Sequence, residues 1–371
     1  MKKIGLGLIL MACAILVVFP FRQQNNTKDF QEDIGNNVVE PVIEKNNNEK
    51  IKIAEGSTFE VRYLDVGQAD AALIECDGHY MLIDGGNVED SSLIVAVLKR
   101  LGITHLDYII GTHEHEDHIG GLAGALNVCS VGQVMCSTAS YDSKAFNSFV
   151  KYTEAQGKEV FIPEVGDSFS LGSSQVTILG PVRKYDDANN NSIVTRIEYG
   201  DTSFLFTGDM EREAELDLLD YWDESKIKST VLKVGHHGSE TSTSYPFLRA
   251  IEPVYGVISV GKGNSYGHPD EAVTSHLRDA EVKVYRTDEQ GDIIILSDGK
   301  QIQVTIEKNE VDFEDTRSAS KEGFQYIGNL RSHKFHLPTC QSLPAEKNLV
   351  YFETREEAIA ANYDPCGNCR P

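Results

Sequence analysis

Short apolar segments alternate with amphipathic segments throughout residues 57–306. Apolar and polar side chains alternate from Phe59 to Asp65, which predicts a half-buried strand. Leucine and valine recur at helical spacing over 91–101, which predicts a helix. The same patterns predict further strands at 71–75, 80–83, 108–110, 174–179, 193–199, 203–207, 230–234, 254–260, 282–285 and 292–296, and helices near 143–154, 211–219 and 270–281. Strands interleaved with helices favour an α/β protein with two mixed sheets covered outside by helices, an αββα sandwich.

The first 21 residues have the pattern of a targeting segment. Two lysines precede an apolar run from Ile4 to Phe19, which Pro20 closes. The run is longer than the core of a signal peptide, about 7–15 residues, and shorter than a membrane span, about 20 residues. Leu10-Met-Ala-Cys13 resembles the acylation signal of lipoproteins, but the apolar run continues beyond it. We therefore expect a signal peptide or membrane anchor at 1–21, and an exported chain that is extracellular or anchored to the outer face of the cytoplasmic membrane.

Two polar segments separate the remaining parts of the chain. Residues 22–56 are rich in Asn, Lys, Glu and Gln, which favours a disordered tether. An acidic linker is expected at 307–323, followed by a separate module at 324–371. The 371 residues carry a formal charge of −23, which argues against a surface that holds nucleic acid by neutralising phosphates. The attraction of any polyanionic substrate must therefore be local.

A cluster of potential metal ligands follows the predicted strand at 108–110. Thr112-His-Glu-His-Glu-Asp-His118 places three imidazoles and several carboxylates at the end of a buried strand. Histidine and carboxylate are preferred zinc ligands, and a catalytic site leaves one position for water. In an extended loop, His113 and His115 lie on the same side, whereas Asp117 and His118 turn toward a second ion. A charged surface loop is the alternative.

These residues match the signature His-x-His-x-Asp-His, and here the chain resembles the metallo-β-lactamase superfamily. An ordered series of motifs over about 57–306 resembles one branch in particular, the hydrolase domain of the ComEC competence proteins. The transmembrane channel of those proteins has no counterpart here, so transport is not implied. The matching motifs are Leu64-Asp-Val-Gly-Gln-Ala-Asp70, Leu82-Ile-Asp-Gly-Gly86, Phe206-Thr-Gly-Asp209, Val234-Gly-His-His-Gly-Ser239 and Gly263-Asn-Ser-Tyr-Gly-His-Pro269.

The resemblance implies a site for two divalent ions, zinc or manganese. His113 and His115 are expected to bind the first ion, Asp117 and His118 the second, and Asp209 both. The segment 186–192 lacks the further histidine of a conventional member, so the remaining ligands must come from elsewhere. The candidates are His236 for the first ion and His268 for the second, with His237 nearby as a general acid, although His236 and His237 can exchange these roles.

The chemistry implied by these ligands is metal-assisted hydrolysis of a phosphodiester, because two ions can stabilise both the attacking and the leaving oxygen. The expected catalytic residues are Asp117, His237, Asn191 and Ser192. Asn191 and Ser192 are candidates to donate hydrogen bonds to a phosphoryl oxygen, and capping of a loop is an equal alternative. Asp84 is expected either to hydrogen-bond a ligand histidine or simply to form an Asp-Gly turn.

The module at 324–371 contains a second set of metal ligands. His336-Leu-Pro-Thr-Cys340 and Cys366-Gly-Asn-Cys369 have zinc-binding spacing, and a short module with a thin core gains stability from a metal. This module resembles the zinc-binding domain of the Ada DNA-repair protein, which implies one structural zinc. Ada uses four cysteines, one of which accepts a methyl group, and His336 replaces one of them. Disulfide bonds between the cysteines of the module are the alternative to zinc. For Cys129 and Cys136 we expect buried thiols, and a disulfide between them is the alternative.

The leading functional hypothesis is a phosphodiesterase or nuclease that acts on extracellular DNA. A cell-wall phosphodiesterase, of the kind that acts on teichoic acid phosphorylcholine, is an alternative that suits the acidic surface equally well. A surface DNA-binding protein on a degenerate hydrolase fold is the non-enzymatic alternative. The expected partner is therefore DNA or another phosphodiester polymer, with the membrane contacted through the N-terminal segment.

Overall fold

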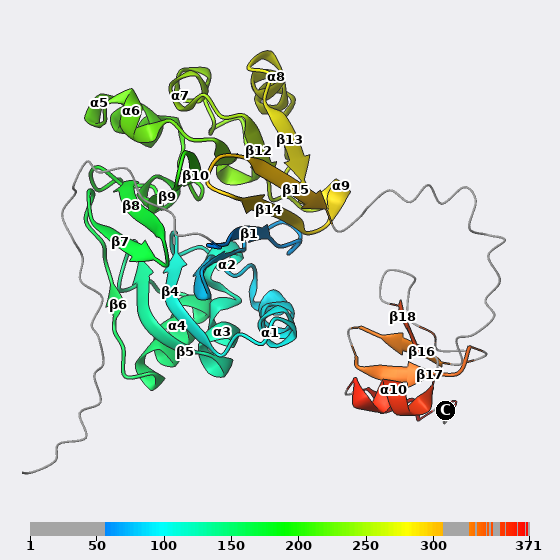
Figure 1. The fold of residues 1–371 in the computed structure, drawn as a ribbon. Helices are drawn as coiled ribbons and strands as arrows, with labels where there is room; N and C mark the ends of the chain where they lie inside the picture. The colour runs from blue at the N-terminus through cyan, green and yellow to red at the C-terminus, as the bar shows by residue number, and fades with distance from the viewer. Residues whose placement is uncertain are drawn as a thin grey trace, which may run out of the picture. The chain divides into compact units, whose positions relative to one another are not determined.

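A computed structural model describes residues 56–306 and, with short interruptions, residues 326–369 (Figure 1). The predicted targeting segment, almost all of the tether and the linker lie outside the described residues. None of the helices within the described ranges is long and apolar enough to cross a membrane.

Residues 56–306 form two mixed sheets that face each other. The eight-stranded sheet has the order β15-β14-β1-β2-β3-β4-β5-β6 and the seven-stranded sheet the order β13-β12-β11-β10-β9-β8-β7. The first contains β1 (Phe59–Tyr63), β2 (Ala72–Cys76), β3 (His79–Ile83), β4 (His105–Gly111), β5 (Ser130–Cys136), β6 (Val160–Phe161), β14 (Ile293–Ser297) and β15 (Ile302–Ile306). The second contains β7 (Ser168–Leu171), β8 (Ser174–Gly180), β9 (Val194–Tyr199), β10 (Thr202–Phe206), β11 (Val231–Lys233), β12 (Tyr255–Ile258) and β13 (Lys283–Arg286).

The core between the sheets is aromatic and aliphatic. Phe59 of β1 packs on Phe204 of β10, with ring centroids 4.8 Å apart, and Tyr63 packs on Phe206 at 5.7 Å. All four side chains are almost completely buried. The alternating pattern at 59–65 therefore points its apolar residues at the opposite sheet, as the period of a half-buried strand requires.

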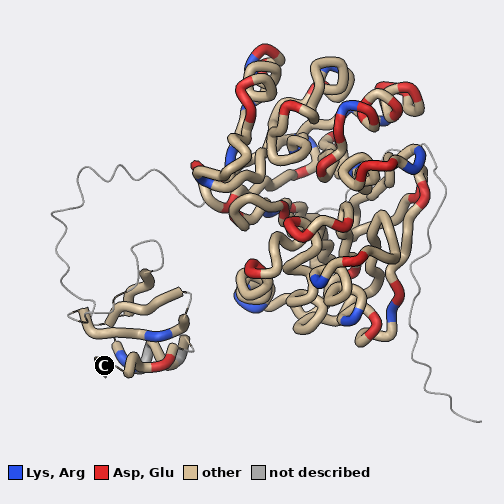
Figure 2. Tube along the Cα trace, turned by 180° about the vertical axis from the view of Figure 1, so that it is seen from behind, with Lys and Arg blue, Asp and Glu red and all other residues tan. Residues whose placement is uncertain are grey.

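Helices cover the outer face of each sheet, which confirms the predicted αββα sandwich (Figure 1). The first sheet packs against α1 (Ser91–Arg100), α3 (Leu122–Val128) and α4 (Lys144–Ala155), and the second against α5 (Arg212–Tyr221), α6 (Glu224–Ile227), α7 (Tyr245–Ile251) and α8 (Glu271–Asp279). Acidic positions are spread over these helices, and no basic stripe is visible along the described chain (Figure 2).

The strands that matter for the site run parallel. In the first sheet β3, β4 and β5 are parallel neighbours, and in the second β10, β11 and β12 are. Because carboxyl ends of parallel strands open at one edge of a sheet, the loops that follow β3, β4, β10, β11 and β12 gather there. Short helices lie in or near these loops: α2 (Glu116–Ile119), η1 (Val88–Asp90), η2 (Asn189–Asn191), η3 (Gly235–Gly238) and α9 (Thr287–Gln290).

The C-terminal module has a sheet of its own, with the order β18-β16-β17-β19 and one helix, α10 (Arg355–Ala360). Its strands are β16 (Tyr326–Asn329), β17 (Lys334–His336), β18 (Leu349–Phe352) and β19 (Asp364–Pro365). Phe335, Phe352, Ala358 and Tyr363 form its small buried core. A core of this size supplies little stability, which is consistent with the expected need for a metal.

Candidate metal centre

The loop after β4 brings the histidines of the sequence cluster together. Nε2 of His113 lies 3.0 Å from Nδ1 of His115, so both nitrogens face one point. Asp117 and His118 form the first turn of α2, which aims their side chains away from the extended residues before them. The predicted division of the cluster into two groups therefore follows from the change of backbone at His115.

A second, more buried group collects ligands from both sheets. Asp117 and His118 come from α2, Asp209 from the loop after β10, and His237 from η3 after β11. One ligand atom from each of these four residues lies within 4.8 Å of the others. Nε2 of His118 is 3.2 Å from Oδ2 of Asp209, and Nε2 of His237 is 3.3 Å from Oδ2 of Asp117.

This group fits a divalent cation by the chemistry of its atoms. Oδ1 of Asp209 is fully buried and makes no hydrogen bond with the described residues. The equally buried Nε2 of His118 faces the carboxylates of Asp209 at 3.2 Å and Asp117 at 3.9 Å. Buried polar atoms without a partner are costly, and imidazole with carboxylate is the set that zinc or manganese binds. The residues present can therefore hold a metal between the sheets.

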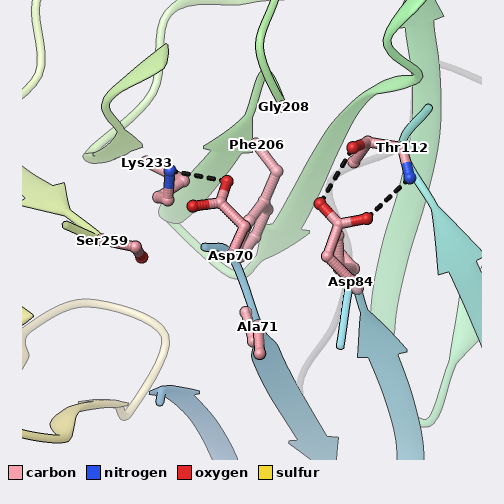
Figure 3. Close-up of a pocket in the computed structure, with 10 residues that line it drawn as sticks. Asp70, Ala71, Asp84, Thr112, Phe206, Gly208, Lys233 and Ser259 are labelled. Carbon is pink, nitrogen blue, oxygen red and sulfur yellow. Dashed lines mark hydrogen bonds and ion pairs between the residues drawn. The ribbon is translucent and has the colours of Figure 1, made fainter. Parts of the chain in front are cut away.

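Asp84 orients His118 from behind. Its carboxylate accepts hydrogen bonds from the backbone N–H of Thr112 at 2.7 Å and from the Thr112 hydroxyl at 2.9 Å (Figure 3). Nδ1 of His118 lies 2.8 Å from the same carboxylate, which leaves Nε2 free to face the cluster. Of the two alternatives for Asp84, the hydrogen bond to a ligand histidine is therefore the one that the structure contains.

A buried ion pair beneath the cluster was missed by the sequence analysis. Nζ of Lys233 lies 2.8 Å from Oδ2 of Asp70 (Figure 3). It also donates to the carbonyl of Val234 at 3.0 Å. Oδ1 of Asp70 lies 3.2 Å from Nδ1 of His237, which also contacts the carbonyl of Ser259 at 3.0 Å. A lysine in the otherwise apolar strand β11 is the signal that could have revealed it.

The adjacent histidines of η3 take different places. Both have positive φ, 47° for His236 and 52° for His237, and this turn sends their rings in different directions. His237 is buried in the second group, whereas His236 is partly exposed, with Nε2 3.6 Å from Asp209 and Nδ1 3.2 Å from Glu211. His237 therefore lies with Asp117 and His118, the residues expected to hold the second ion, and not with His113 and His115. His236, the expected ligand of the first ion, lies on the exposed side of Asp209.

His268 lies at the edge of the centre. Its ring is 5.8 Å from that of His236, its Nδ1 is 3.5 Å from the amide of Gln68, and its Nε2 is 3.8 Å from Asp270. It does not belong to the four-residue group, so its expected role as a ligand of the second ion has no support in the distances.

Asn191 and Ser192 make different contacts. The Asn191 amide donates to the carbonyls of Tyr185 and Asp187 and accepts from the Tyr185 N–H, at 2.8–2.9 Å. Its side chain therefore caps the loop, which is the alternative to phosphoryl binding. Ser192 is closer to the centre, because its hydroxyl accepts from the Asp209 N–H at 3.1 Å and lies 3.4 Å from Nδ1 of His113.

Electrostatics keep the carboxylates of this group ionised. Burial opposes ionisation of Asp117, but His118 and His237 outweigh it and lower its pKa to about 2. Burial also disfavours charge on His237, yet Asp209 and Asp70 raise its pKa to about 10, so a metal ion would have to displace a proton from this ring. Burial and the neighbouring His118 hold the pKa of His113 well below its usual value, which keeps that ring neutral, the form that binds metal.

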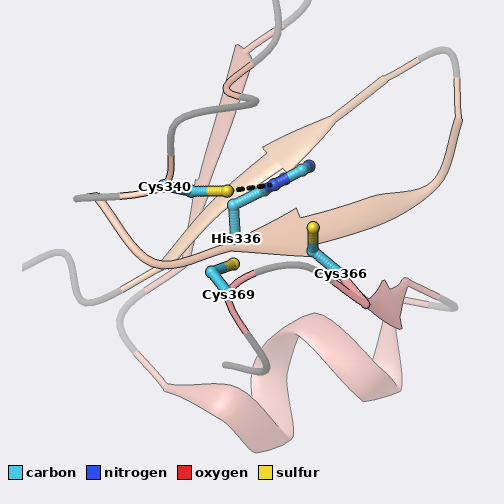
Figure 4. Close-up of side chains that lie close together, drawn as sticks. All are labelled: His336, Cys340, Cys366 and Cys369. Atoms are coloured by element: carbon cyan, nitrogen blue, oxygen red, sulfur yellow. Dashed lines mark hydrogen bonds between the residues drawn. The ribbon is translucent and has the colours of Figure 1, made fainter.

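The C-terminal module contains a separate metal site. His336 and Cys340 flank the end of β17, and Cys366 and Cys369 follow β19; their ligand atoms lie within 4.8 Å of one another (Figure 4). Nδ1 of His336 is 3.3 Å from Sγ of Cys340, and the N–H of Leu337 donates to Sγ of Cys369 at 3.4 Å. Within the described residues none of these three cysteines forms a disulfide, nor do Cys129 and Cys136, so the disulfide alternatives are not found.

The fold and the two-sheet centre define a metal-dependent hydrolase of the metallo-β-lactamase fold. The family model described as the metallo-beta-lactamase superfamily matches residues 64–262, over half of the chain, and the chain belongs to that superfamily. A model described as the metal binding domain of Ada matches residues 311–371.

The curated relatives include competence proteins. ComE operon protein 3 of Bacillus subtilis is 30% identical over 257 residues, which cover 64% of this chain and 33% of the relative. Competence protein ComA of Neisseria gonorrhoeae is 31% identical over 229 residues, 61% of this chain and 30% of the relative. The chain thus spans about a third of the length of these relatives.

Solved structures give more distant likenesses. The metallo hydrolase Igni18 of Ignicoccus hospitalis has 16% identity and a TM-score of 0.43, covering 63% of this chain and 98% of that one. The metallo-beta-lactamase fold protein YhfI of Bacillus subtilis has 10% identity and a TM-score of 0.38, covering 61% and 95%.

Proposed function

We propose that this chain hydrolyses phosphodiester bonds of DNA outside the cytoplasm. The observation that carries the proposal is the convergence of Asp117, His118, Asp209 and His237, next to His113 and His115, from both sheets. The competence proteins among the relatives supply the link to DNA as substrate. The predicted segment at 1–21 supports an exported or membrane-anchored location.

In this proposal the described residues have distinct tasks. His113 and His115 would hold one ion, Asp117, His118 and His237 would hold the other, and Asp209 would serve as a ligand of both. Bound ions supply Lewis acidity and lower the pKa of coordinated water toward about 7. His236 carries the proton for the leaving alkoxide, because it is partly exposed and Glu211 contacts its Nδ1 at 3.2 Å. Ser192 positions Asp209 through the backbone N–H of that residue.

The C-terminal module binds one structural zinc in this proposal. Three thiols and one imidazole are a complete tetrahedral ligand set, so the site is closed to substrate. Because His336 replaces one of the four cysteines, the role of the zinc is to stabilise the fold of the module. The folded module then contacts the DNA backbone.

A cell-wall phosphodiesterase remains the second candidate because the chain carries 57 acidic and 34 basic residues. That balance opposes the approach of a polyanion. Acidic positions occur along much of the described chain (Figure 2). A phosphorylcholine ester, which has a cationic end, meets no such repulsion.

The test is hydrolysis by the full chain with Zn²⁺ or Mn²⁺ on single- and double-stranded DNA, bis-p-nitrophenyl phosphate and p-nitrophenylphosphorylcholine. Asp209→Asn should lower activity more than about 100-fold, since even residues behind the ligands cost 10–100-fold. Asp217→Asn, on the outer helix α5 and paired with Arg183, is the matched control and should retain activity.

Metal content measured by mass spectrometry should fall in Asp209→Asn and not in Asp217→Asn. Activity that survives Asp209→Asn would rule out a centre built on this carboxylate. Hydrolysis of the choline ester alone would transfer the proposal to the cell wall. Binding of DNA without cleavage, lost on removal of 324–371, would favour the non-enzymatic alternative.

A further inference from the structure

The loop between β12 and α8, residues 259–270, presents an aromatic ring to solvent beside the metal centre. Tyr266 is 71% exposed, more than any other large exposed apolar side chain in the described part of the chain. An aromatic ring exposed to this degree contributes little to folding. Because single exposed apolar side chains are common on protein surfaces, the informative feature is the place of Tyr266, in the same loop as His268 and beside the metal centre.

The loop holds this ring in a fixed place. The side-chain oxygen of Asn264 accepts from the N–H groups of Tyr266 and His268, both at 3.1 Å, and its amide donates to the carbonyls of Gly261 and His268 at 3.0 and 2.7 Å. The Gly261 N–H donates to the Gln68 side chain at 3.0 Å, which ties the loop to the first sheet's half of the domain. The backbone that carries the tyrosine is thus preorganised before any ligand arrives.

A line of rings leads from Tyr266 to the metal ligands. Tyr266 stacks on His268 with centroids 5.6 Å apart and planes at 25°. The His268 ring is 5.8 Å from that of His236, whose Nε2 is 3.6 Å from Asp209. One face of the tyrosine ring is therefore covered on the side of the centre, and the other is open to solvent.

We propose that Tyr266 stacks on an unpaired nucleobase next to the phosphodiester held at the metal centre. The inference rests on the proposed phosphodiesterase function and names its substrate class as single-stranded or frayed DNA. A base can reach an exposed ring only when it leaves the duplex, and such stacking tolerates every base. The exposed Lys262 in the same loop adds a cation for a flanking phosphate.

The same ring is less suited to a choline headgroup. Quaternary ammonium ions are recognised in cages of several aromatic rings. Among the described residues, the ring contact of Tyr266 is with His268 alone, and the tyrosine offers one flat open face. A flat ligand such as a base covers that face more completely than a compact cation does.

The test compares two oligonucleotides of equal length, oligothymidine and an oligomer of abasic sites with the same phosphates. The full chain, Tyr266→Ala, Tyr266→Trp and the control Tyr245→Ala, which removes a 46% exposed tyrosine on α7, are each measured with both. Tyr266→Ala should raise KM for oligothymidine about tenfold and leave the abasic oligomer unchanged. Tyr266→Trp should retain the low KM, and Tyr245→Ala should behave as the unaltered chain.

Equal effects of Tyr266→Ala on the two oligomers, or no effect on either, would overturn the stacking role. A raised KM for p-nitrophenylphosphorylcholine with none for oligothymidine would overturn the base as ligand. Binding of the oligonucleotides, measured by fluorescence anisotropy, separates a failure of the stacking role from a failure of the proposed function. Failure of the unaltered chain to cleave any phosphodiester contradicts the proposed function, whereas equal binding of the thymidine and abasic oligomers contradicts the stacking.

Discussion

The buried pair of Lys233 and Asp70 beneath the metal centre can be tested by replacing Lys233 with Met. The side chains are only 4% and 6% exposed, and their charged atoms lie 2.8 Å apart. Methionine keeps most of the length and apolar volume of lysine, so the change removes the charge with little loss of packing. It leaves Asp70 buried with its Oδ2 unpaired.

Removal of one partner from a buried ion pair costs about 3–5 kcal/mol, because the remaining charge stays buried. For Asp70, the contact with Nδ1 of His237 at 3.2 Å is left to offset part of this cost. At about 2–4 °C per kcal/mol for a domain of this size, Lys233→Met should lower the melting temperature by about 6–20 °C. The exposed pair of Lys228 and Glu252, 3.1 Å apart with side chains 45% and 61% exposed, provides the control. Lys228→Met should cost about 0–1 kcal/mol.

Tryptophan fluorescence is the assay, because Trp222 is the only tryptophan of the chain and lies in the hydrolase domain, where it donates to the Leu179 carbonyl. Unfolding is followed with a chelator present, so that no bound metal contributes charge. The double variant Lys233→Met with Asp70→Asn should recover part of the loss. A cost for Lys233→Met within about 1 kcal/mol of that for Lys228→Met would refute the role of the pair.

Two further predictions concern other buried groups. Burial raises the pKa of Glu215 to about 7, although it accepts the N–H groups of Thr243 and Ser244. A raised folded pKa means that the contribution is complete below about pH 4.5 and lost as pH rises through about 7. Between those pH values the free energy of unfolding of the unaltered chain should thus fall by about 3 kcal/mol relative to that of Glu215→Gln. If Trp222 fluorescence gives the same difference between the two proteins at pH 5 and at pH 8, the prediction is contradicted. In the C-terminal module, Cys366→Ser should lower the zinc content by one ion without shifting the Trp222 transition; an unchanged zinc content would exclude Cys366 as a ligand.

The fold was predictable from the sequence where the apolar pattern is regular. The strand at β1 and the helices α1 and α4 were placed within a few residues. The strand β5 was not predicted, because Gly132 and Gln133 interrupt its apolar run. Gly132 is required there by the close approach of the Asp107 carbonyl, which a Cβ atom would meet. A tertiary contact thus removed the local signal.

The cluster at 113–118 was predictable because its residues are close together in the sequence, directly after a buried strand. The positions of the His236 and His237 rings were not predictable. Both residues have left-handed backbone conformations, and the sequence does not show in which direction each ring then points. Lys233 lies in β11 and Asp70 in the loop between β1 and β2, and no local pattern relates them. The Asn191 alternatives were resolved by hydrogen bonds within its own loop.

The distribution of the cluster over two sheets also determines when the site can exist during synthesis. Asp117 and His118 leave the ribosome long before Asp209 and His237, and β10 and β11 must pair before the latter two meet the former. A nascent or truncated chain therefore holds half of the centre. Capture of metal is coupled to completion of the domain, so that unfinished chains carry no working hydrolase.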